Sequence, residues 1–418
     1  MNVPTPSAPP PSAAASPSAP AVPPVSPVSP VSAASWVSPA SPASLAPTAE
    51  QDALRDAVRA VLARHPGPAA WGPLTERVGV AALAVPEEYG GLGCGPAETG
   101  VVMAELGRAL SPVPYLGSAV LTVGALLAAG DGAALARHLP GLADGSVVGA
   151  LAWAEESPGG PGGWEAGDLA ARAEGAGRYL GHGCGRDLLL TGAKRYVLTG
   201  PDHPGLLLAF ARAADTGRLG LYELTAPPRE FTVRATMDQT RPLASLTLDR
   251  TPARLLSADG TAVLGRVLDL ACTALAAEQA GAAARALEVT VRHVKERVQF
   301  GRPIGSFQAV KHRLADLYTA VETARALALA AAAADAAPAL AAAAAAACSE
   351  AFAQVAGEMI QLHGGIGITW EHEAHTFFKR AHGSTHLFGP PAAHRRRLAT
   401  HLGYGPGRGV GAGALMGL

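Results

Sequence analysis

Two segments in the last third of the chain combine residue types that can hold a phosphate-bearing ligand. Arg297 opens the run RVQFGRPIGSFQAVKH, and its guanidinium has a fixed fork of donors that suits a diphosphate. Gly364 and Gly365 lie in the run QLHGGIGITWEHE. Glycine has no Cβ, so backbone amides there can come close to a phosphate or a flat ring. Together the two segments have the residue types of a phosphate-binding site.

Other residues that often do chemistry are interpreted as structural. His312 and His372 are possible bases, but such histidines are more often hydrogen-bonding partners within a fold. Cys272 reads as a small core residue. The four cysteines are far apart and include no CxxC pair, which argues against a zinc site or a disulfide framework. We therefore expect no bound metal.

The composition narrows the classes of function. The 418 residues carry a formal net charge of −1, from 33 Lys and Arg against 34 Asp and Glu. This balance lacks the basic footprint of a general nucleic-acid binder, so no nucleic acid is expected. The most apolar stretch, about 324–347, is mostly alanine and contains Arg325, Asp335 and Pro338, so no membrane span is expected. No secretion signal is visible, and we expect a cytoplasmic location.

The elements that must position the two segments follow a helix–strand–helix order and predict an α+β fold. Residues 1–49 contain no charged side chain and are expected to be a disordered tail. A helical domain is expected over 50–148, beginning where Thr48 and Gln51 have capping-box spacing. Short apolar runs split by Gly, Pro and Asp predict a small β-barrel or β-sandwich domain over 149–260. Helical periodicity predicts a four-helix bundle over 261–404, followed by a flexible tail over 405–418.

Individual elements can also be predicted inside the last two domains. The expected strands are 150–154, 188–190, 196–199, 206–210, 219–224 and 243–248. One long helix is expected over about 262–295 and a second from 306. A third should open at Pro338, since proline suits a first helical position, and end at the glycines after His363.

Five segments in this order resemble the acyl-CoA dehydrogenase family of flavoproteins over about residues 50–404. They are VPEEYGGLG (85–93), TGAK (191–194), MDQTRPL (237–243) and the two runs described above. The resemblance implies an N-terminal helical domain, a middle β-barrel and a C-terminal four-helix bundle. It also implies FAD bound between the barrel and the bundle, with a neighbouring subunit completing the site. Arg297, Gln299, Phe300 and Gln308 would then contact one FAD.

The resemblance assigns the remaining cofactor residues to a second FAD. Gln361, Gly364 and Gly365 would help hold the FAD of the other subunit. Family members oxidise the Cα–Cβ bond of an acyl thioester: a carboxylate takes the α-proton and flavin N5 accepts the β-hydride. An acyl-CoA or acyl-carrier thioester, an electron-transfer acceptor protein and a tetrameric assembly are the implied partners.

The usual catalytic base of the family is missing from this sequence. It is commonly a Glu just before a Gly, and here that position holds Phe388, followed by Gly389. A second known placement of the base, on the first long C-terminal helix, corresponds to Ala271. Neither side chain can accept a proton. His386, with His382, lies on the segment that normally carries the base and is the candidate for a replacement.

Three functions remain open at this point. The chain is a subunit of a hetero-oligomeric acyl-CoA dehydrogenase whose paralogous partner supplies the Glu. Alternatively, it is a stand-alone flavin oxidoreductase or monooxygenase of the same fold with a non-standard base such as His386. The third alternative is a non-catalytic flavin-binding scaffold.

Overall fold

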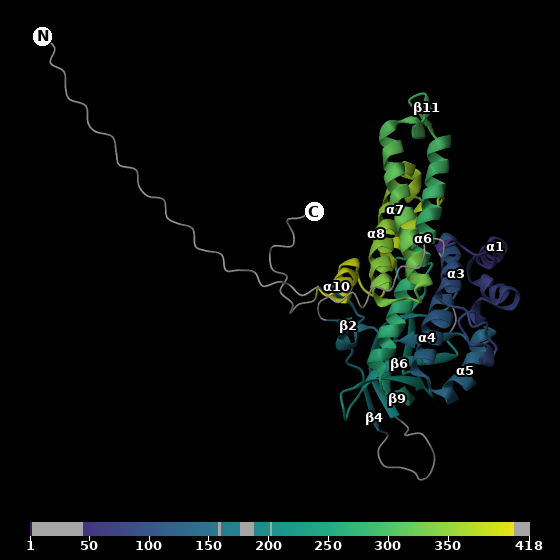
Figure 1. Cartoon of the computed structure of the whole chain (residues 1–418), viewed down its shortest axis with the longest axis vertical. Helices are drawn as coiled ribbons and strands as arrows, with labels where there is room; N and C mark the ends of the chain where they lie inside the picture. The colour runs from purple at the N-terminus through teal and green to yellow at the C-terminus, as the bar shows by residue number, and fades with distance from the viewer. Residues whose placement is uncertain (2–44, 158–159, 176–187, 201–202, 405–418) are drawn as a thin grey trace, which may run out of the picture. The chain divides into compact units, whose positions relative to one another are not determined.

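The computed structural model describes residues 1, 45–157, 160–175, 188–200 and 203–404 (Figure 1). Most of the tail predicted for 1–49, and all of the tail predicted for 405–418, lie outside the described residues. By their contacts, Met1–Pro39 and Ala40–Leu418 are separate units. The description below concerns the second unit.

The first described elements are helical and begin at the expected cap. The Thr48 hydroxyl accepts from the Gln51 backbone N–H, and Gln51 Oε1 accepts from the Thr48 N–H, both at 3.2 Å. This capping box starts α1 (Ala49–Arg64). The elements that follow are η2 (Gly67–Ala70), α2 (Trp71–Pro73), η3 (Leu74–Val78), η4 (Val80–Ala82), η5 (Glu87–Tyr89), α3 (Pro96–Arg108), η6 (Leu116–Thr122), α4 (Val123–Ala129) and α5 (Gly132–Ala143).

The middle of the chain forms a sheet that closes on itself. Its strands are β1 (Gly149–Ala152), β4 (Arg172–Gly175), β5 (Leu188–Leu198), β6 (Leu206–Ala213), β7 (Leu219–Leu224), β8 (Glu230–Arg234) and β9 (Leu243–Ser257), beside a separate pair, β2 (Glu155–Ser157) and β3 (Gly160–Gly163). One edge of β6 pairs in parallel with β1 and β4, and its other edge pairs with β7. β4 also pairs with β5, β5 with β9, and β9 with β7. The ring of paired strands therefore closes into a barrel.

One strand runs where two were expected. The prediction of separate strands at 188–190 and 196–199 is wrong, because β5 continues through the TGAK segment. The pairing of β5 with β9 is irregular around the glycine of this segment. The register shifts between Leu190 and Gly192 and again between Lys194 and Val197. Gly192 has a φ of 153° and Tyr196 a φ of 53°, so the backbone kinks at these two places instead of turning.

A buried ion pair braces the barrel wall. Lys194 on β5 is fully buried, and its ammonium donates to Glu155 Oε1 at 2.5 Å and to the Trp153 carbonyl at 3.2 Å. Glu155 also accepts from the backbone N–H groups of Ala170 and Ala171. Burial lowers the pKa of Lys194 to about 8, although the Glu155 charge acts in the opposite direction. The pair fixes the segment that follows β1.

The C-terminal part contains three long helices and two shorter ones. The long helices are α6 (Gly260–Glu296), α7 (Gln308–Ala333) and α8 (Pro338–His363), close to the predicted spans. Between them lie the hairpin strands β10 (Val298–Gln299) and β11 (Arg302–Pro303) and the turn η8 (Ile304–Ser306). The turn η9 (Gly364–Ile368) and the helices α9 (Ala374–Thr385) and α10 (Pro391–His401) follow. In Figure 1, α6, α7 and α8 run together from the barrel towards the hairpin.

Helices α3 and α6 approach each other closely at two glycines. A Cβ on Gly107 would lie 2.0 Å from the Glu278 carbonyl oxygen, and a Cβ on Gly281 would lie 2.1 Å from the Ala104 carbonyl oxygen. Neither backbone can move aside cheaply, because both belong to packed helices. The two glycines therefore set the distance between the N-terminal helices and the bundle.

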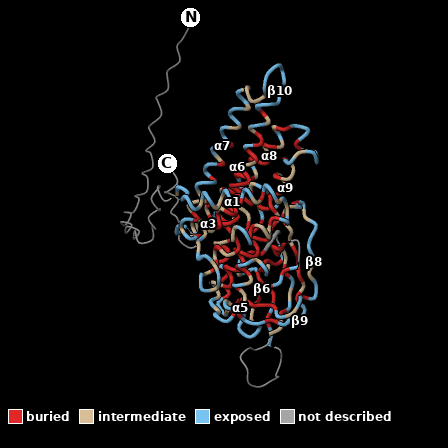
Figure 2. The backbone as a smooth tube through the Cα atoms, turned by 90° about the vertical axis from the view of Figure 1, so that its right-hand side faces the viewer, coloured by how far each residue is buried: buried red, intermediate tan, exposed pale blue. Residues whose placement is uncertain are grey.

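Two helical stretches are long and apolar enough to cross a membrane by length and composition, Gly260–Glu296 and Pro338–Ile368. Most of the apolar window of each is buried inside the protein. Figure 2 shows the same buried centre, where α6 and α8 pass through the molecule. Burial of this kind is typical of core helices.

Candidate functional site

The first predicted cofactor segment forms an exposed hairpin beyond the end of α6. Arg297 caps α6, and β10 and β11 then turn back through Phe300 and Gly301. Both turn residues have positive φ values, 52° and 76°, as a tight two-residue hairpin requires. Arg297, Gln299 and Gln308 are exposed, and the Phe300 side chain is 91% exposed. No ion pair of Arg297 is found among the described residues, so its guanidinium can meet an incoming anion.

The second predicted segment is the turn after α8. Gln361, Gly364 and Gly365 are all exposed. Gly364 has a φ of 62°, a conformation that favours glycine, and it ends the helix as expected. A Cβ on either glycine would meet nothing within 4 Å. The open side of this turn is therefore accessible to a ligand or to another subunit.

Three histidine rings in a row connect the two segments, and the rings of the first pair, His293 and His363, are stacked. The ring of His293, near the end of α6, lies 4.2 Å from that of His363, at the end of α8, and His372 lies 4.3 Å beyond His363. His363 Nδ1 bonds the Met359 carbonyl at 2.7 Å and must therefore carry the proton, which leaves Nε2 as an acceptor. The hairpin and the glycine turn thus lie at one end of the bundle.

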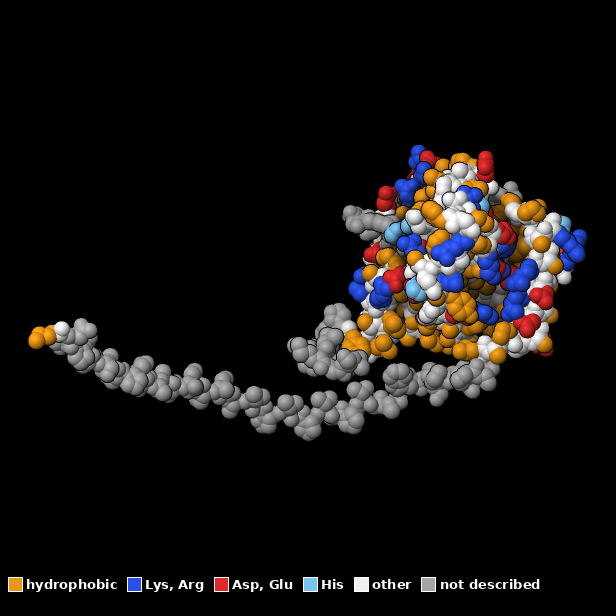
Figure 3. All heavy atoms as spheres, turned by 90° about the horizontal axis from the view of Figure 1, so that it is seen from above, with side chains coloured by type: hydrophobic (Ala, Val, Ile, Leu, Met, Phe, Trp, Pro, Cys, Tyr) orange, Lys and Arg blue, Asp and Glu red, His pale blue; other side chains and the backbone are white. Residues whose placement is uncertain are grey.

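This end of the molecule is cationic and partly apolar. Figure 3 looks down on it and shows Lys and Arg side chains among hydrophobic ones. Exposed hydrophobic side chains come from both segments: Val298, Phe300, Ile366, Ile368 and Trp370. The uncommitted Arg297, the amide side chains and the open glycine turn have the chemistry that the diphosphate part of a dinucleotide requires. This end of the chain therefore fits FAD.

We expect Arg297→Ala to reduce FAD binding strongly. Removing one charge-assisted contact to a phosphate should cost about 1.5–3 kcal/mol, or roughly tenfold to 150-fold in affinity. The measurement is flavin absorbance per chain after gel filtration at matched dilution. Arg325→Ala, at an exposed position on α7, is the control and should keep the wild-type flavin content. Equal flavin in both variants would contradict the assignment.

The row of histidines should make stability pH-dependent. The pKa of His363 is lowered from 6.5 to about 4, mainly by burial and to a smaller extent by the charges of His293 and His372, although the hydrogen bond to the Met359 carbonyl acts in the opposite direction. The folded state therefore resists protonation, so stability is complete above about pH 6.5 and falls as the pH falls towards 4. We expect the melting temperature of His363→Asn to decline less over this range. His312→Asn, at an exposed position, should decline like the wild type. Identical slopes for wild type and His363→Asn would count against this role.

Phe388, at the expected base position, is enclosed by aromatic rings. Its ring stacks on Trp153 at 5.6 Å with an interplanar angle of 13°, and lies edge-on to Trp164 at 5.4 Å. Only 2% of Phe388 is exposed, and its φ of 66° precedes Gly389 at 116°. The backbone is thus held in a turn that aims this side chain inward. The side chain is part of a packed apolar cluster, and it carries no group that can take a proton.

The second inert position and its neighbour are also buried. Ala271 lies in the core with no exposed surface. Cys272 faces a cavity of about 10 Å³ beside Phe388. Burial raises the pKa of its thiol to about 12, so Cys272 stays protonated near neutral pH and cannot serve as a base there. Among the described residues, no carboxylate lines this cavity, whose walls are Cys272, Leu275, Gln279, Ala345, Ser349, Ser384, Leu387, Phe388, Gly389 and His394.

A histidine, His394, also lies in that lining, and sequence reasoning missed it. It lies on α10, is 4% exposed, and its Nδ1 is 3.9 Å from the Cys272 sulfur. Burial lowers its pKa, so it is neutral near pH 7 and can accept a proton. His386, by contrast, is exposed at the end of α9, and exposed His382 packs on Phe378. The structure therefore does not bring His386 into the cavity with Phe388.

A second cavity, of about 310 Å³, lies on the opposite face of α6. It is lined by Leu270, Thr273 and Ala274 of α6 together with residues of α3 and α4, whereas the Phe388 cavity takes Cys272, Leu275 and Gln279 from the same helix. At 100° per residue these two sets point in opposite directions. The two cavities are therefore separated by the helix itself.

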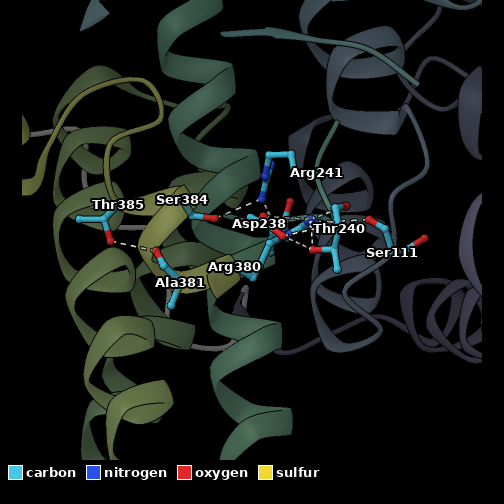
Figure 4. Close-up of polar contacts among 9 residues, drawn as sticks. Ser111, Asp238, Thr240, Arg241, Arg380, Ala381, Ser384 and Thr385 are labelled. Carbon is cyan, nitrogen blue, oxygen red and sulfur yellow. Dashed lines mark hydrogen bonds and ion pairs between the residues drawn. The ribbon is translucent and has the colours of Figure 1, made fainter. Parts of the chain in front are cut away.

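Buried charges join the three parts of the fold next to the Phe388 cavity (Figure 4). Glu278 on α6 accepts from Arg380 Nε at 2.9 Å and also from Arg241, which comes from the segment between β8 and β9. Arg380, on α9, also donates to the Thr240 carbonyl at 2.8 Å and the Ser111 carbonyl at 3.3 Å. Arg241, Glu278 and Arg380 are each at most 6% exposed. We call these three residues the junction cluster.

The fold and this end of the bundle together define a class of protein: a flavoprotein dehydrogenase with helical, barrel and helical-bundle parts. Models of the acyl-CoA dehydrogenase N-terminal and C-terminal domains match residues 48–146 and 258–403. The chain is 40% identical over 378 residues to the acyl-CoA dehydrogenase IpdE2 of Mycobacterium tuberculosis, which covers 87% of this chain and 100% of that protein. This chain belongs to the acyl-CoA dehydrogenase family, whose members are FAD-dependent oxidoreductases acting on CH–CH bonds.

Two solved structures extend the likeness. The Tcur3481-Tcur3483 steroid ACAD variant is similar with a TM-score of 0.72 and 30% identity, covering 85% of this chain and 98% of that chain. The ChsE4-ChsE5 complex from Mycobacterium tuberculosis is similar with a TM-score of 0.75 and 28% identity, covering 87% and 99%. The structural neighbours thus include a complex of two different chains.

Proposed function

We propose that this chain is one subunit of a hetero-oligomeric acyl-CoA dehydrogenase that desaturates an acyl thioester between Cα and Cβ. A paralogous partner supplies the catalytic Glu. The observation that carries this proposal is the enclosed Phe388. The position that should present a base to the α-proton instead packs between Trp153 and Trp164, and Ala271 offers no substitute.

The cofactor residues have a separate part in this proposal. FAD, when bound, supplies the acceptor for the β-hydride. Arg297, Gln299, Phe300 and Gln308 hold one FAD through the hairpin end of this chain. Gln361, Gly364 and Gly365 help hold the FAD of a neighbouring subunit. A chain that keeps these exposed groups but lacks a base is suited to completing a cofactor site in a shared assembly.

Exposed apolar side chains at the same end support an oligomer. Phe300, Ile368 and Trp370 are 91%, 71% and 74% exposed in the single chain. Grouped apolar side chains with a cationic rim are typical of a protein contact surface. We infer a tetramer in which this surface meets the paralogous partner. The substrate is an acyl-CoA or an acyl-carrier thioester, an electron-transfer protein reoxidises the flavin, and the location is cytoplasmic.

The test is co-expression with a paralogue that has Glu before Gly at the position of Phe388. We expect the two chains to co-elute on size-exclusion chromatography with a flavin spectrum. Arg297→Ala in this chain should lower the flavin content of the complex. Two chains that elute separately, each with its own flavin, would contradict the proposal. A flavin-free chain that does not associate would favour the scaffold.

One observation supports a second candidate, a stand-alone oxidoreductase. His394 lies in the lining of the Phe388 cavity, and burial keeps it neutral. If the isolated chain reduces its flavin with an acyl-CoA, His394→Asn should abolish this reduction. His386→Asn should leave the rate of flavin reduction unchanged. The reverse pattern would point to His386 as the base.

A further inference from the structure

The cavity of about 310 Å³ beside α6 lies where the N-terminal helices meet the bundle. Its walls come from the start of α3, from η6 and α4, from α6, and from the turn between α7 and α8. Figure 1 shows α3 and α4 next to α6 in this part of the molecule. The lining residues Ala119 and Val120 are buried, whereas Gly95 and Ala128 are exposed. The cavity therefore reaches from the surface into the core.

The walls of this cavity are mostly apolar, and small residues leave the space. Ala119, Gly124 and Ala128 line it from η6 and α4, and Ala274 lines it from α6. Larger apolar side chains complete the walls: Val120, Val123, Leu127 and Leu270. Protein interiors contain few voids larger than a water molecule, because the atoms around a void lose their contacts. A void of this size between packed helices calls for an occupant.

Part of the wall has an unusual backbone. Ala119 and Val120 belong to η6, a π-helix of seven residues that leads directly into α4. π-helical segments are rare and are found frequently at functional sites. The backbone of this wall therefore also indicates a binding role for the cavity.

The charges at the cavity favour an uncharged occupant. Among the described residues, the charged side chains of the lining are Arg266 and Asp335. They pair with each other: Arg266 donates to Asp335 Oδ1 at 2.9 Å and to the Asp335 carbonyl at 2.7 Å. The nearby Glu98 carboxylate accepts from the Gln51 side chain and from the Gly95 N–H. A charged ligand of either sign would gain no free partner to replace its hydration.

The volume limits the size of the occupant. A dry apolar cavity of about 150 Å³ binds benzene, a molecule of six carbons, so a cavity about twice as large can take about ten to twelve non-hydrogen atoms. We propose that this cavity is a binding site for an uncharged apolar molecule of that size, such as a medium-length alkyl alcohol or a fused pair of rings. The occupant would hold α3, α4 and α6 together from the face of α6 opposite Phe388.

The proposed site is separate from the proposed cofactor residues. α7 has 26 residues and therefore extends about 39 Å from the hairpin to the turn that contains Asp335. The cavity lies at this turn, and α6 stands between it and the Phe388 cavity. The proposal therefore does not depend on which subunit binds FAD or supplies the base.

Xenon tests whether the cavity takes apolar atoms. Crystals of the full-length protein under xenon pressure should show an anomalous peak between α4 and α6, because dry apolar cavities bind xenon. Ala128→Trp places a large side chain at the exposed part of the lining and should remove the peak. Ala136→Trp, the same change at an exposed position of α5 outside the lining, should keep it. Ordered water in place of xenon in wild-type crystals would overturn the proposal.

Octan-1-ol provides a solution measurement, with Cys94 as the reporter. Cys94 lines the cavity and is half-buried, and burial raises the pKa of its thiol, so N-ethylmaleimide should modify it slowly. Bound octan-1-ol should slow this modification further, as read by mass spectrometry of the Cys94 peptide. Octanoate and octanoyl-CoA at equal concentration should leave the rate unchanged.

Variants and the charged ligands decide between the outcomes. In Ala128→Trp, octan-1-ol should no longer change the modification rate, whereas in Ala136→Trp it should protect Cys94 as in the wild type. Leu127→Trp, at a half-buried lining position, carries the test if Ala128→Trp does not fold. Equal protection by octanoyl-CoA would make this an acyl-thioester site and overturn the proposal. Flavin reduction by an acyl-CoA, measured on the same sample, tests the proposed function separately.

Discussion

The complex of this chain with a Glu-bearing paralogue should oxidise an acyl-CoA at least about a hundredfold faster than this chain alone. A positioned general base is worth about 10²–10⁴-fold in rate, and Phe388 and Ala271 cannot act as one. The measurement is reduction of an artificial electron acceptor by the complex and by each isolated chain, at equal flavin content. The complex should lose its activity when the Glu of the partner is replaced by Gln.

Two controls separate the possible origins of activity. His394→Asn in this chain should leave the turnover of the complex within a few-fold if the partner supplies the base. Robust flavin reduction by the rigorously isolated chain would contradict partner dependence. If that reduction disappears in His394→Asn, the base is the buried histidine beside Phe388.

Glu278→Ala should destabilise the protein by about 3–5 kcal/mol, because it leaves two buried guanidinium groups, Arg241 and Arg380, without their shared carboxylate. The matched control is Glu288→Ala on the same helix. Glu288 also pairs with an arginine, Arg108, at 2.8 Å, but it is half-exposed. Such a pair contributes about 0–1 kcal/mol.

Urea unfolding midpoints of the two variants measure the difference. Glu278→Gln, which keeps an acceptor oxygen, should be less destabilised than Glu278→Ala and provides a folded variant if Ala does not fold. Equal losses at positions 278 and 288 would show that the junction cluster does not hold the three parts together.

Local signals made much of the fold predictable. The start of α1 depends on Thr48 and Gln51, three residues apart, and the structure confirms their reciprocal bonds. α8 begins at Pro338 and ends at the glycine after His363, and each of these residues affects only the helical turn next to it. The order of helical, strand-rich and helical regions was predictable from patterns that extend over tens of residues: helical periodicity at both ends, and short apolar runs split by Gly, Pro and Asp in the middle. Such signals need no knowledge of distant contacts.

What the sequence did not reveal depends on long-range packing. β8 (Glu230–Arg234) is largely exposed and polar, and its strand character comes from pairing with β9. β5 continues past the kink at Gly192 because it pairs with β4 on one side and with β9 on the other.

The site posed the same difficulty. The segment PAAHRRRLATH reads as an exposed cationic helix, so nothing local marks His394 as buried. Glu278 meets Arg241 and Arg380 from 37 and 102 residues away in the chain. The sequence did show that the catalytic base is missing, because Gly389 identifies the preceding residue, Phe388, as the position where the family has its Glu. The cofactor residues stay a prediction from resemblance, to be tested with Arg297→Ala.

The close approach of α3 and α6 at Gly107 and Gly281 has a consequence for how this sequence can evolve. Every single substitution at either position adds a Cβ about 2 Å from a carbonyl oxygen of the facing helix. Because each glycine meets a different residue, Glu278 or Ala104, changing one does not relieve the other. Neither position can drift through a neutral intermediate. Across divergent relatives with the same helix contact, these two alignment columns should stay fixed while the exposed residues beside them vary.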